Sequence, residues 1–209
     1  MSNIITISRE FGSGGREVGK RLADLLQIPY YDNEIISRIA EESGLSEVYV
    51  AKNKSNISHS YPISVGRTFI SPPLVSLSDQ IFQSQCKIIR QLGEEGPCVI
   101  VGRCGDFFLK DQSPLSIYIH ADLEDRISRC YEKGYEDVTL SHKEMKNKVV
   151  SVDKNRRKYY EYYTGQKWHQ LQNYSVCIST SRFGVKGTAK VLAGLYEIAQ
   201  ERPNKGETS

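Results

Sequence analysis

An apolar, β-branched run near the N-terminus leads directly into a glycine-rich turn, and this junction limits the possible folds more than any other stretch. The run is 4–7, and the turn holds three glycines within residues 12–15. Apolar residues then recur at helical spacing, at Val18, Leu22, Leu25 and Leu26. Glycines let successive N–H groups point inward, and a following helix adds unpaired donors and a positive dipole end. The sequence therefore predicts a strand, an anion-binding loop suited to phosphate, and a helix.

Two frames place this loop differently. Phosphate-binding loops usually read G-x-x-x-x-G-K followed by Ser or Thr. In one frame Lys20 is the lysine, Arg21 stands where the magnesium-binding hydroxyl belongs, and the helix is left only from 20 to about 26. In the other frame the loop occupies 9–15 directly after the strand, and the helix starts near Gly15. We prefer the second frame, because it keeps all four apolar residues on one helical stripe.

The preferred frame puts Gly15 at the place of the lysine and Arg16 at the next place. Lys20 then lies more than one helical turn away, too far to reach the same phosphate. Either Arg16 or Arg9 supplies the missing charge, because a guanidinium forks well onto phosphate oxygens. Ser13 is a weak substitute for the absent hydroxyl. A glycine-rich turn that binds no ligand is the alternative that this stretch alone leaves open.

Length and composition favour one globular domain. The chain has 209 residues, 39% of them hydrophobic, which is enough for one sizeable core with an insertion or two. A net charge of +3 argues against a strongly nucleic-acid-binding protein but allows a local basic patch for small anions. The sequence has no signal-peptide pattern and no apolar run of about 18 residues. Five cysteines without a C-x-x-C pair indicate free thiols rather than zinc. We therefore expect a cytoplasmic protein without a membrane partner.

Short apolar runs alternate with helical patterns along the rest of the chain. Further strands are expected at 28–32, 98–101, 115–119 and 175–180. Further helices are expected around 35–40, 75–92 with Gly93 at its end, 123–130 and 188–199. Alternation of this kind predicts an α/β three-layer domain in which helices flank a parallel sheet.

Polar residues follow two of the predicted strands. Asp32 ends the second strand, and Arg103 follows the buried run 98–101. Carboxyl ends of parallel strands meet at one edge of a sheet, so we expect both residues beside the glycine loop. A helix cap at Asp32 and an ordinary surface position for Arg103 are the alternatives. The helix at 75–92 carries four polar side chains that either reach a ligand or form its solvent-exposed face: Asp79, Gln80, Gln83 and Gln85. We favour the solvent-exposed face.

Positive charge is concentrated near the middle of the second half of the chain. Residues 141–168 contain eight Lys or Arg against three Asp or Glu, and tyrosines lie among them. A helical lid whose arginines close on phosphates explains this segment. A nucleic-acid surface and a solvated charged helix are the other interpretations. The near-neutral total charge makes nucleic acid the least favoured partner.

Taken in order, these pieces resemble the cytidylate kinase-like proteins, within the nucleoside monophosphate kinase group of the P-loop NTPases. The loop Arg-Glu-Phe-Gly-Ser-Gly-Gly-Arg-Glu, at 9–17, is rather specific for this branch. The other matching pieces are specific only as an ordered set over most of the chain: Pro-Tyr-Tyr-Asp at 29–32, the Gly-Arg strand at 99–103, the helix at 121–129 and the closing strand at 173–184.

The resemblance implies a P-loop fold and a phosphotransferase that uses ATP and Mg²⁺. The acceptor would be a nucleoside monophosphate such as CMP or dCMP, or a related small molecule. By position, the donor phosphates would lie at Gly12, Ser13, Gly14, Gly15, Arg16 and Glu17, with Arg126 by the donor base. Asp32 and Arg103 would face the acceptor. Arg16, Arg156 and Arg157 would act on the transferring phosphoryl group, and no side chain is assigned as a metal ligand.

Two positions depart from the family pattern. Gly15 stands where cytidylate kinases have the loop lysine, and Cys104 stands where they have an acid, with Asp106 as the nearest replacement. A nucleotide-binding regulator without kinase activity is therefore the alternative function. We expect one domain at 1–200, with a mobile substrate-side insertion at 44–74, a basic lid at 131–168 and a frayed tail at 201–209. The expected partners are small nucleotides, and a homodimer is left open.

Overall fold

The computed structural model describes residues 3–32, 34–44, 77–134 and 139–201. Five strands form one sheet in the order β2-β3-β1-β4-β5, and every neighbouring pair is parallel. The strands are β1 (Ile4–Arg9), β2 (Tyr30–Tyr31), β3 (Cys98–Val101), β4 (Leu115–His120) and β5 (Val176–Ser179). The predicted α/β fold with a parallel sheet is thus confirmed. The insertion expected at 44–74 and the tail at 201–209 lie, apart from their first residues, outside the described residues.

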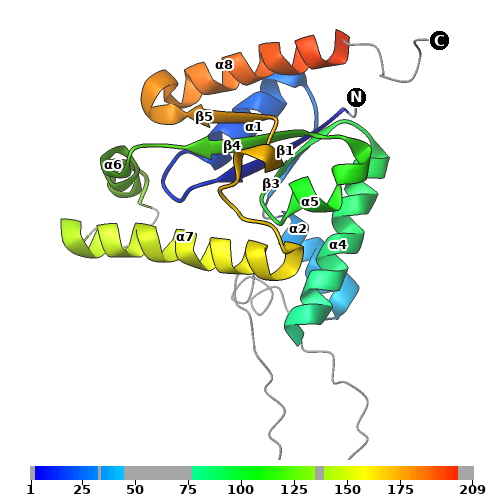
Figure 1. Ribbon diagram of the computed structural model, residues 1–209, viewed down its shortest axis with the longest axis horizontal. Coiled ribbons are helices and arrows are strands. Elements are labelled where there is room, and N and C mark those ends of the chain that lie inside the picture. Colours follow the sequence, from blue (N-terminus) through cyan, green and yellow to red (C-terminus); the bar gives the residue numbers. More distant parts are fainter. Residues whose placement is uncertain (1–2, 33, 45–76, 135–138, 202–209) are drawn as a thin grey trace, which may run out of the picture.

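Helices cover both faces of this sheet (Figure 1). The described helices are α1 (Gly15–Leu26), α2 (Glu34–Ser43), α4 (Leu77–Glu95), α5 (Gly105–Phe108), α6 (Leu123–Lys133), α7 (His142–Thr164) and α8 (Thr180–Glu201), with 3₁₀ turns at Lys110–Gln112 and Leu171–Asn173. Helices α1 and α8 lie on one face, and α2, α4, α5 and α7 lie on the other (Figure 1). None of the helices in the described part of the chain is long and apolar enough to cross a membrane.

Strand residues alternate between two cores, as a period of two requires. In β1, Ile5 and Ile7 pack toward α1 and α8, whereas Ile4 belongs to the core on the other face. All four residues of β3 are buried, which is typical of a strand covered on both sides in a parallel sheet. The two hydrophobic layers fix the sheet, so the carboxyl ends of its strands are held at one edge.

Helix α1 starts at Gly15, as the preferred frame of the loop predicts. Val18 and Leu22 are fully buried, but Leu25 is 53% exposed, so the prediction of one stripe with four apolar residues was wrong. At 3.6 residues per turn, Gly19 lies closer to the centre of the buried stripe than Leu25 does. A Cβ on Gly19 would lie 3.0–3.2 Å from three side chains, so this glycine lets the helix approach the sheet.

Two helix boundaries also differ from the prediction. Helix α4 continues past Gly93 to Glu95, because Gly93 serves packing rather than termination. A Cβ there would lie 2.7 Å from Leu109 Cδ2. The last helix begins at Thr180 rather than 188, and its backbone leaves helical geometry at Gly184, where φ is 62° and ψ is 168°.

The basic segment contains one continuous helix, α7. Ser141 and Glu144 form a capping box at its start, with the Glu144 N–H donating to Ser141 Oγ and the Ser141 N–H donating to Glu144. Met145 and Val149 pack against α6 through Ile127 and other apolar residues. This packing holds α7 against one face of the sheet (Figure 1), and Arg156 of α7 reaches the Arg9 carbonyl at the end of β1.

Candidate functional site

A cavity of about 90 Å³ lies at the carboxyl edge of the sheet, beside the glycine loop. Four arginines line it: Arg9, Arg16, Arg103 and Arg156. Among the lining residues that the structure describes, Asp32 is the one carboxylate, so the ionisable side chains carry a net charge of about +3. We refer to this space as the arginine cavity. Its charge makes it a site for a multiply charged anion.

The topology of the sheet brings these side chains together from five segments. Arg9 ends β1, Arg16 lies in the first turn of α1, and Asp32 follows β2. Arg103 follows β3, and Arg156 extends from α7. Because β2, β3 and β1 are parallel neighbours, their carboxyl ends place these residues on one side of the molecule. The surface position considered for Arg103 therefore does not apply, and Asp32 lies against the loop.

Asp32 is tied to the glycine loop by two ion pairs. Its carboxylate lies 2.7 Å from Arg16 Nε and 3.7 Å from Arg9. Asp32 is only 8% exposed, whereas the Arg16 side chain is 48% exposed. Asp32 therefore orients the two loop arginines and offsets part of their mutual repulsion.

The turn after β3 has an unusual backbone. Gly102, Arg103 and Cys104 have φ angles of 76°, 60° and 55°, so three consecutive residues are in the left-handed region. This conformation costs a non-glycine residue about 1–2 kcal/mol. It aims the Arg103 side chain into the arginine cavity, where burial lowers the pKa of its guanidinium.

Gln85 of α4 stabilises this turn. Its Nε2 donates to the Arg103 carbonyl at 3.0 Å, and its Oε1 lies 3.5 Å from the Arg103 guanidinium. Gln85 is fully buried, so its predicted place on the solvent face was wrong, while Gln80 and Gln83 are exposed. The signal was present in the sequence, because position 85 has helical spacing to Ile81 and to the other buried residues of α4.

The two adjacent lid arginines lie in different environments. Arg156 lines the arginine cavity, and its guanidinium donates to the Arg9 carbonyl at 3.0 Å. It also lies over the Phe11 ring, 5.5 Å from the centroid. Arg157 is exposed and is not among the described residues that line the cavity. Only Arg156 is therefore positioned on the cavity side of α7.

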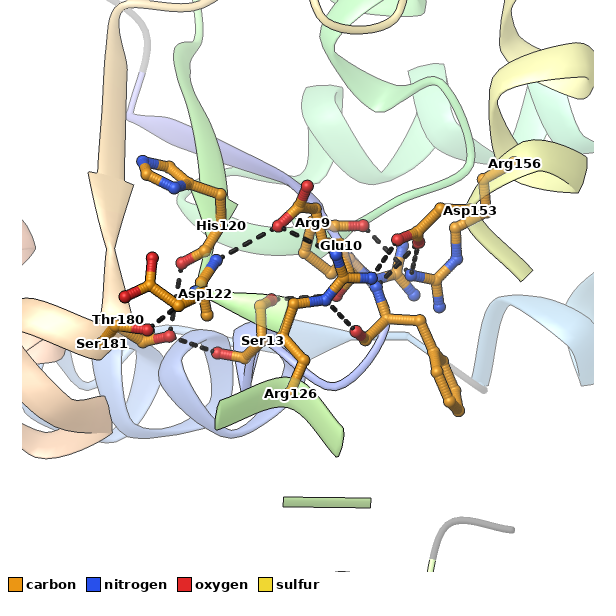
Figure 2. Close-up of polar contacts among 12 residues, drawn as sticks. Arg9, Glu10, Ser13, His120, Asp122, Arg126, Asp153, Arg156, Thr180 and Ser181 are labelled. Carbon is orange, nitrogen blue, oxygen red and sulfur yellow. Dashed lines mark hydrogen bonds and ion pairs between the residues drawn. The ribbon is translucent and has the colours of Figure 1, made fainter. Parts of the chain in front are cut away.

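A buried network joins the loop to α6 and α7 (Figure 2). Asp153 accepts the Phe11 N–H at 2.8 Å, pairs with Arg126, and lies 3.4 Å from Arg156. Arg126 also donates from Nε to the Phe11 carbonyl at 2.7 Å and lies 3.4 Å from Glu10. We refer to Glu10, Arg126, Asp153 and Arg156 as the loop clamp.

The loop clamp contains residues that sequence reasoning missed. Neither Glu10 nor Asp153 was singled out as a site residue. Arg126 is only 7% exposed and its guanidinium contacts Glu10 and Asp153, so its visible role is to hold the loop. Its place beside a donor base stays a prediction. A Cβ at Gly12 would lie 2.6 Å from the Arg126 carbonyl oxygen, so the loop and α6 also touch through their backbones.

The glycine loop leads directly into the N-terminus of α1. Gly14 is the N-cap, with φ at 79°, and the first helical bond joins the Val18 N–H to the Gly14 carbonyl at 2.9 Å. Backbone N–H groups in the first turn of a helix precede its first internal bond and point out of its N-terminus. Together with the dipole of α1 they suit a phosphate group.

Ser13 and Glu17 have other partners than a ligand. The Ser13 hydroxyl donates to the Glu10 carbonyl at 2.9 Å, and the Ser13 carbonyl accepts from Thr180 Oγ1 at 2.7 Å (Figure 2). Glu17 lies 3.1 Å from Arg21 and 3.5 Å from Lys133. In the described part of the chain, no group of three or more His, Cys, Asp or Glu is arranged to hold a metal ion. The described residues of the loop therefore form no side-chain cage for a cation.

Cys104 and Asp106 do not provide a charged acid in the arginine cavity. Burial and the nearby Asp106 raise the pKa of the Cys104 thiol well above its usual value, so the thiol stays protonated. Asp106 lines a separate cavity of about 160 Å³ and accepts a hydrogen bond of 2.6 Å from the Tyr160 hydroxyl. Tyr160, which lines the arginine cavity, thus separates Asp106 from it.

Burial raises the pKa of Asp106 to about 6 from 3.8, and this shift predicts a pH effect on stability. Between these values the folded protein holds a proton that the unfolded chain has lost, so this residue lowers stability as the pH rises. Asp106→Asn removes that contribution while keeping an acceptor for Tyr160. We expect the variant's unfolding free energy, relative to wild type, to rise by about 2 kcal/mol between pH 4 and pH 7 in urea titrations. If the difference in unfolding free energy between Asp106→Asn and wild type did not change between pH 4 and pH 7, the raised pKa of Asp106 would be contradicted.

Comparison with known proteins agrees with this geometry. The profile of the cytidylate kinase-like family matches residues 4–182. No curated protein matches the chain. An uncharacterized protein from Eubacterium ventriosum has a crystal structure that aligns with a TM-score of 0.67 and 26% identity, over 93% of this chain and 98% of that one.

Two shikimate kinases show the same fold at lower identity. The enzyme from Acinetobacter baumannii, in complex with shikimate, aligns with a TM-score of 0.55 and 15% identity over 97% of both chains. The enzyme from Bacteroides thetaiotaomicron aligns with a TM-score of 0.58 and 12% identity, over 93% of this chain and 98% of that one. The fold is therefore that of the P-loop kinases, and the family profile spans most of the sequence. The chain belongs to the cytidylate kinase-like family.

Proposed function

We propose that this protein is a phosphotransferase that moves the γ-phosphoryl group of ATP to a small phosphorylated acceptor of the CMP or dCMP type. The observation that carries the proposal is the convergence of four arginines on one cavity beside the glycine loop. Like charges at this spacing repel one another, and Asp32 offsets only part of the repulsion. A phosphate dianion supplies the missing negative charge.

The cavity favours a phosphorylated acceptor over an uncharged one. With Asp32 already paired to Arg16 and Arg9, a neutral hydroxyl compound would leave the net charge of about +3 uncompensated. A phosphate monoester brings two negative charges and several acceptor oxygens, which suit the forked donors of Arg103 and Arg156. Selectivity for a nucleotide then depends on contacts to the base, and this part of the substrate is carried over from the family resemblance.

The donor fits the loop by its phosphates. Backbone amides at the start of α1 and the guanidinium of Arg9 suit a nucleotide's phosphate chain. The Ser13 hydroxyl, the candidate magnesium ligand of the loop, already donates a hydrogen bond within the loop. The described residues therefore fit a magnesium ion that arrives bound to the nucleotide rather than one held by protein side chains. Magnesium bound to ATP would neutralise charge on the β- and γ-phosphates.

Residues of the cavity then position the phosphates and keep water out. Arg156, held by Asp153 and the Arg9 carbonyl, would contact the transferring phosphoryl group. Tyr159, Tyr160 and Trp168 form buried aromatic walls that limit access of water. Phosphoryl transfer needs alignment and charge neutralisation more than a strong base, so the protonated Cys104 is compatible with this chemistry.

Release of ADP from ATP and Mg²⁺, measured with a panel of acceptors, tests the proposal. The panel contains CMP, dCMP, UMP, AMP, GMP and a few acceptors that are not nucleotides. We expect at least one phosphorylated acceptor to raise ADP release well above the rate with ATP alone. If ATP binds but no acceptor raises the rate, the proposal of a phosphotransferase is wrong.

A nucleotide-binding regulator is the second candidate, and one observation favours it. Gly15 stands where phosphate-binding loops carry their lysine, and a side chain there would lie 2.5 Å from Arg9 Cβ. The site therefore cannot take up a lysine at this position without moving Arg9. A regulator would bind ATP with Mg²⁺ but transfer no phosphate to any acceptor, which the same assay distinguishes.

A further inference from the structure

The loop departs from the usual pattern at positions 9, 15 and 16, and the departures at positions 9 and 15 are complementary. In the frame that the structure bears out, the pattern G-x-x-x-x-G-K requires glycine at position 9 and lysine at position 15. This chain has Arg9 and Gly15 instead. A long cation thus occupies the glycine position, and a glycine occupies the position of the cation.

The side chain of Arg9 lies across the space that a side chain at position 15 would need. A Cβ on Gly15 would lie 2.5 Å from Arg9 Cβ and 2.8 Å from Arg9 Cγ. The far end of Arg9 rests against a second glycine, because a Cβ on Gly102 would lie 2.0 Å from Arg9 Nη1. Two glycines on separate segments therefore make room for one arginine, which a side chain serving only as surface charge would not require.

The described residues leave part of the Arg9 guanidinium without a hydrogen bond. Its Nε is buried and has no hydrogen-bond partner among the residues that the structure describes. Its nearest carboxylate, Asp32, is 3.7 Å away and makes a closer pair with Arg16. Burial, followed by the charge of Arg156, lowers the pKa of Arg9 to about 9, so its protein surroundings disfavour its charged form. An anion in the cavity would relieve both the missing hydrogen bond and the repulsion.

We propose that Arg9 is the phosphate-binding cation of this loop, having exchanged places with the glycine that the usual pattern carries at its first position. This inference rests on the proposed function, in that the ligand is a phosphate chain. It assigns the loop charge to Arg9 rather than to Arg16, whose side chain is half exposed and paired with Asp32. The positive charge for the phosphate thus comes from a residue at the end of β1 rather than from one at the start of α1.

Binding of inorganic pyrophosphate, measured by isothermal titration calorimetry, tests the assignment without requiring turnover. Arg9→Ala should weaken binding by about 10- to 100-fold, the range for a lost charge-assisted contact. Arg16→Ala should weaken it less than 5-fold. Arg90→Ala is the matched control, because it removes an exposed arginine of α4 that does not line the arginine cavity, and we expect binding within 2-fold of wild type.

Thermal unfolding separates a binding role from a structural one. Without ligand, Arg9→Ala should melt at the same temperature as wild type or higher, because it removes an unsatisfied cation from a repulsive cluster. With pyrophosphate present, wild type should gain stability and the variant should gain much less. Loss of stability in the unliganded variant would show that Arg9 is a structural residue and would overturn the inference.

Reciprocal exchange gives the sharpest test. Gly15→Lys alone should impair folding, because the new side chain meets Arg9. Combining it with Arg9→Gly recreates the usual pattern, and the double variant should bind pyrophosphate within about 5-fold of wild type, a strong non-additivity. A folded double variant that binds no better than Arg9→Ala would contradict the exchange.

The two levels of the proposal fail in different ways. If wild type binds neither pyrophosphate nor ATP, the loop is not a phosphate site, and the proposed function falls together with the inference. If wild type binds pyrophosphate and Arg9→Ala binds it equally well, only the assignment of Arg9 is wrong.

Discussion

Replacing Asp153 with alanine is expected to lower the free energy of unfolding by about 3–5 kcal/mol, the cost of breaking a buried ion pair by removing one partner. Asp153 is 8% exposed and contacts Arg126, Arg156 and the Phe11 N–H. Its loss leaves two guanidinium groups and one amide without this acceptor, in a region where water does not easily replace it. Urea unfolding followed by circular dichroism measures the change.

Glu124→Ala provides the matched control for this prediction. Glu124 is an exposed acid of α6 that lies 2.8 Å from His142, so its removal should change stability by no more than about 0.5 kcal/mol. A loss below 1 kcal/mol for Asp153→Ala would mean that the loop clamp does not hold the loop against α6 and α7.

Arg156→Ala should reduce kcat by about 1,000-fold, whereas Arg157→Ala should reduce it less than 3-fold. Arg156 lines the arginine cavity, and the neighbouring Arg157 is exposed on another side of α7. An arginine that stabilises charge in the transition state affects turnover more than ground-state binding, so the Kd for ATP should change less than 5-fold. Steady-state kinetics and ATP titrations of both variants provide the comparison.

The pair is informative because the two variants remove the same charge from adjacent positions. Equal losses of kcat in both would mean that overall basicity, not placement, matters. A fall in ATP affinity as large as the fall in kcat would count against a role in transfer and would favour simple binding.

Most of the fold could be predicted from the sequence because its signals are local. Strand β3 is a continuous apolar run in the sequence. The helical spacing of apolar residues in α1 favours the frame of the glycine loop in which the helix starts at Gly15. Errors arose where packing between distant segments decided the outcome. Gly93 looked like a helix end, but the structure uses it for close contact with Leu109, which the local sequence does not reveal.

The candidate site was predicted only in part for the same reason. The carboxyl ends of parallel strands meet at one edge of a sheet, which predicted that Asp32 and Arg103 lie beside the loop. Both line the arginine cavity in the structure. Asp153 could not be found in this way, because its partners Arg126 and Phe11 lie 27 and 142 residues away in the chain. Reasoning from residue types left both Arg9 and Arg16 open for the loop charge, and the family resemblance pointed to Arg16. The space required above Gly15 distinguishes them, and it depends on coordinates rather than on sequence pattern.

Phosphorus NMR of the wild-type protein with ATP, Mg²⁺ and CMP, extended to the other acceptors, tests the central claim most directly. It separates transfer from simple hydrolysis, which ADP release alone does not. We predict that resonances of ADP and of a newly formed diphosphate on the acceptor appear together and in equal amounts. ADP accompanied only by inorganic phosphate, or unchanged ATP despite its binding, would contradict the claim that the arginine cavity holds a phosphoryl acceptor.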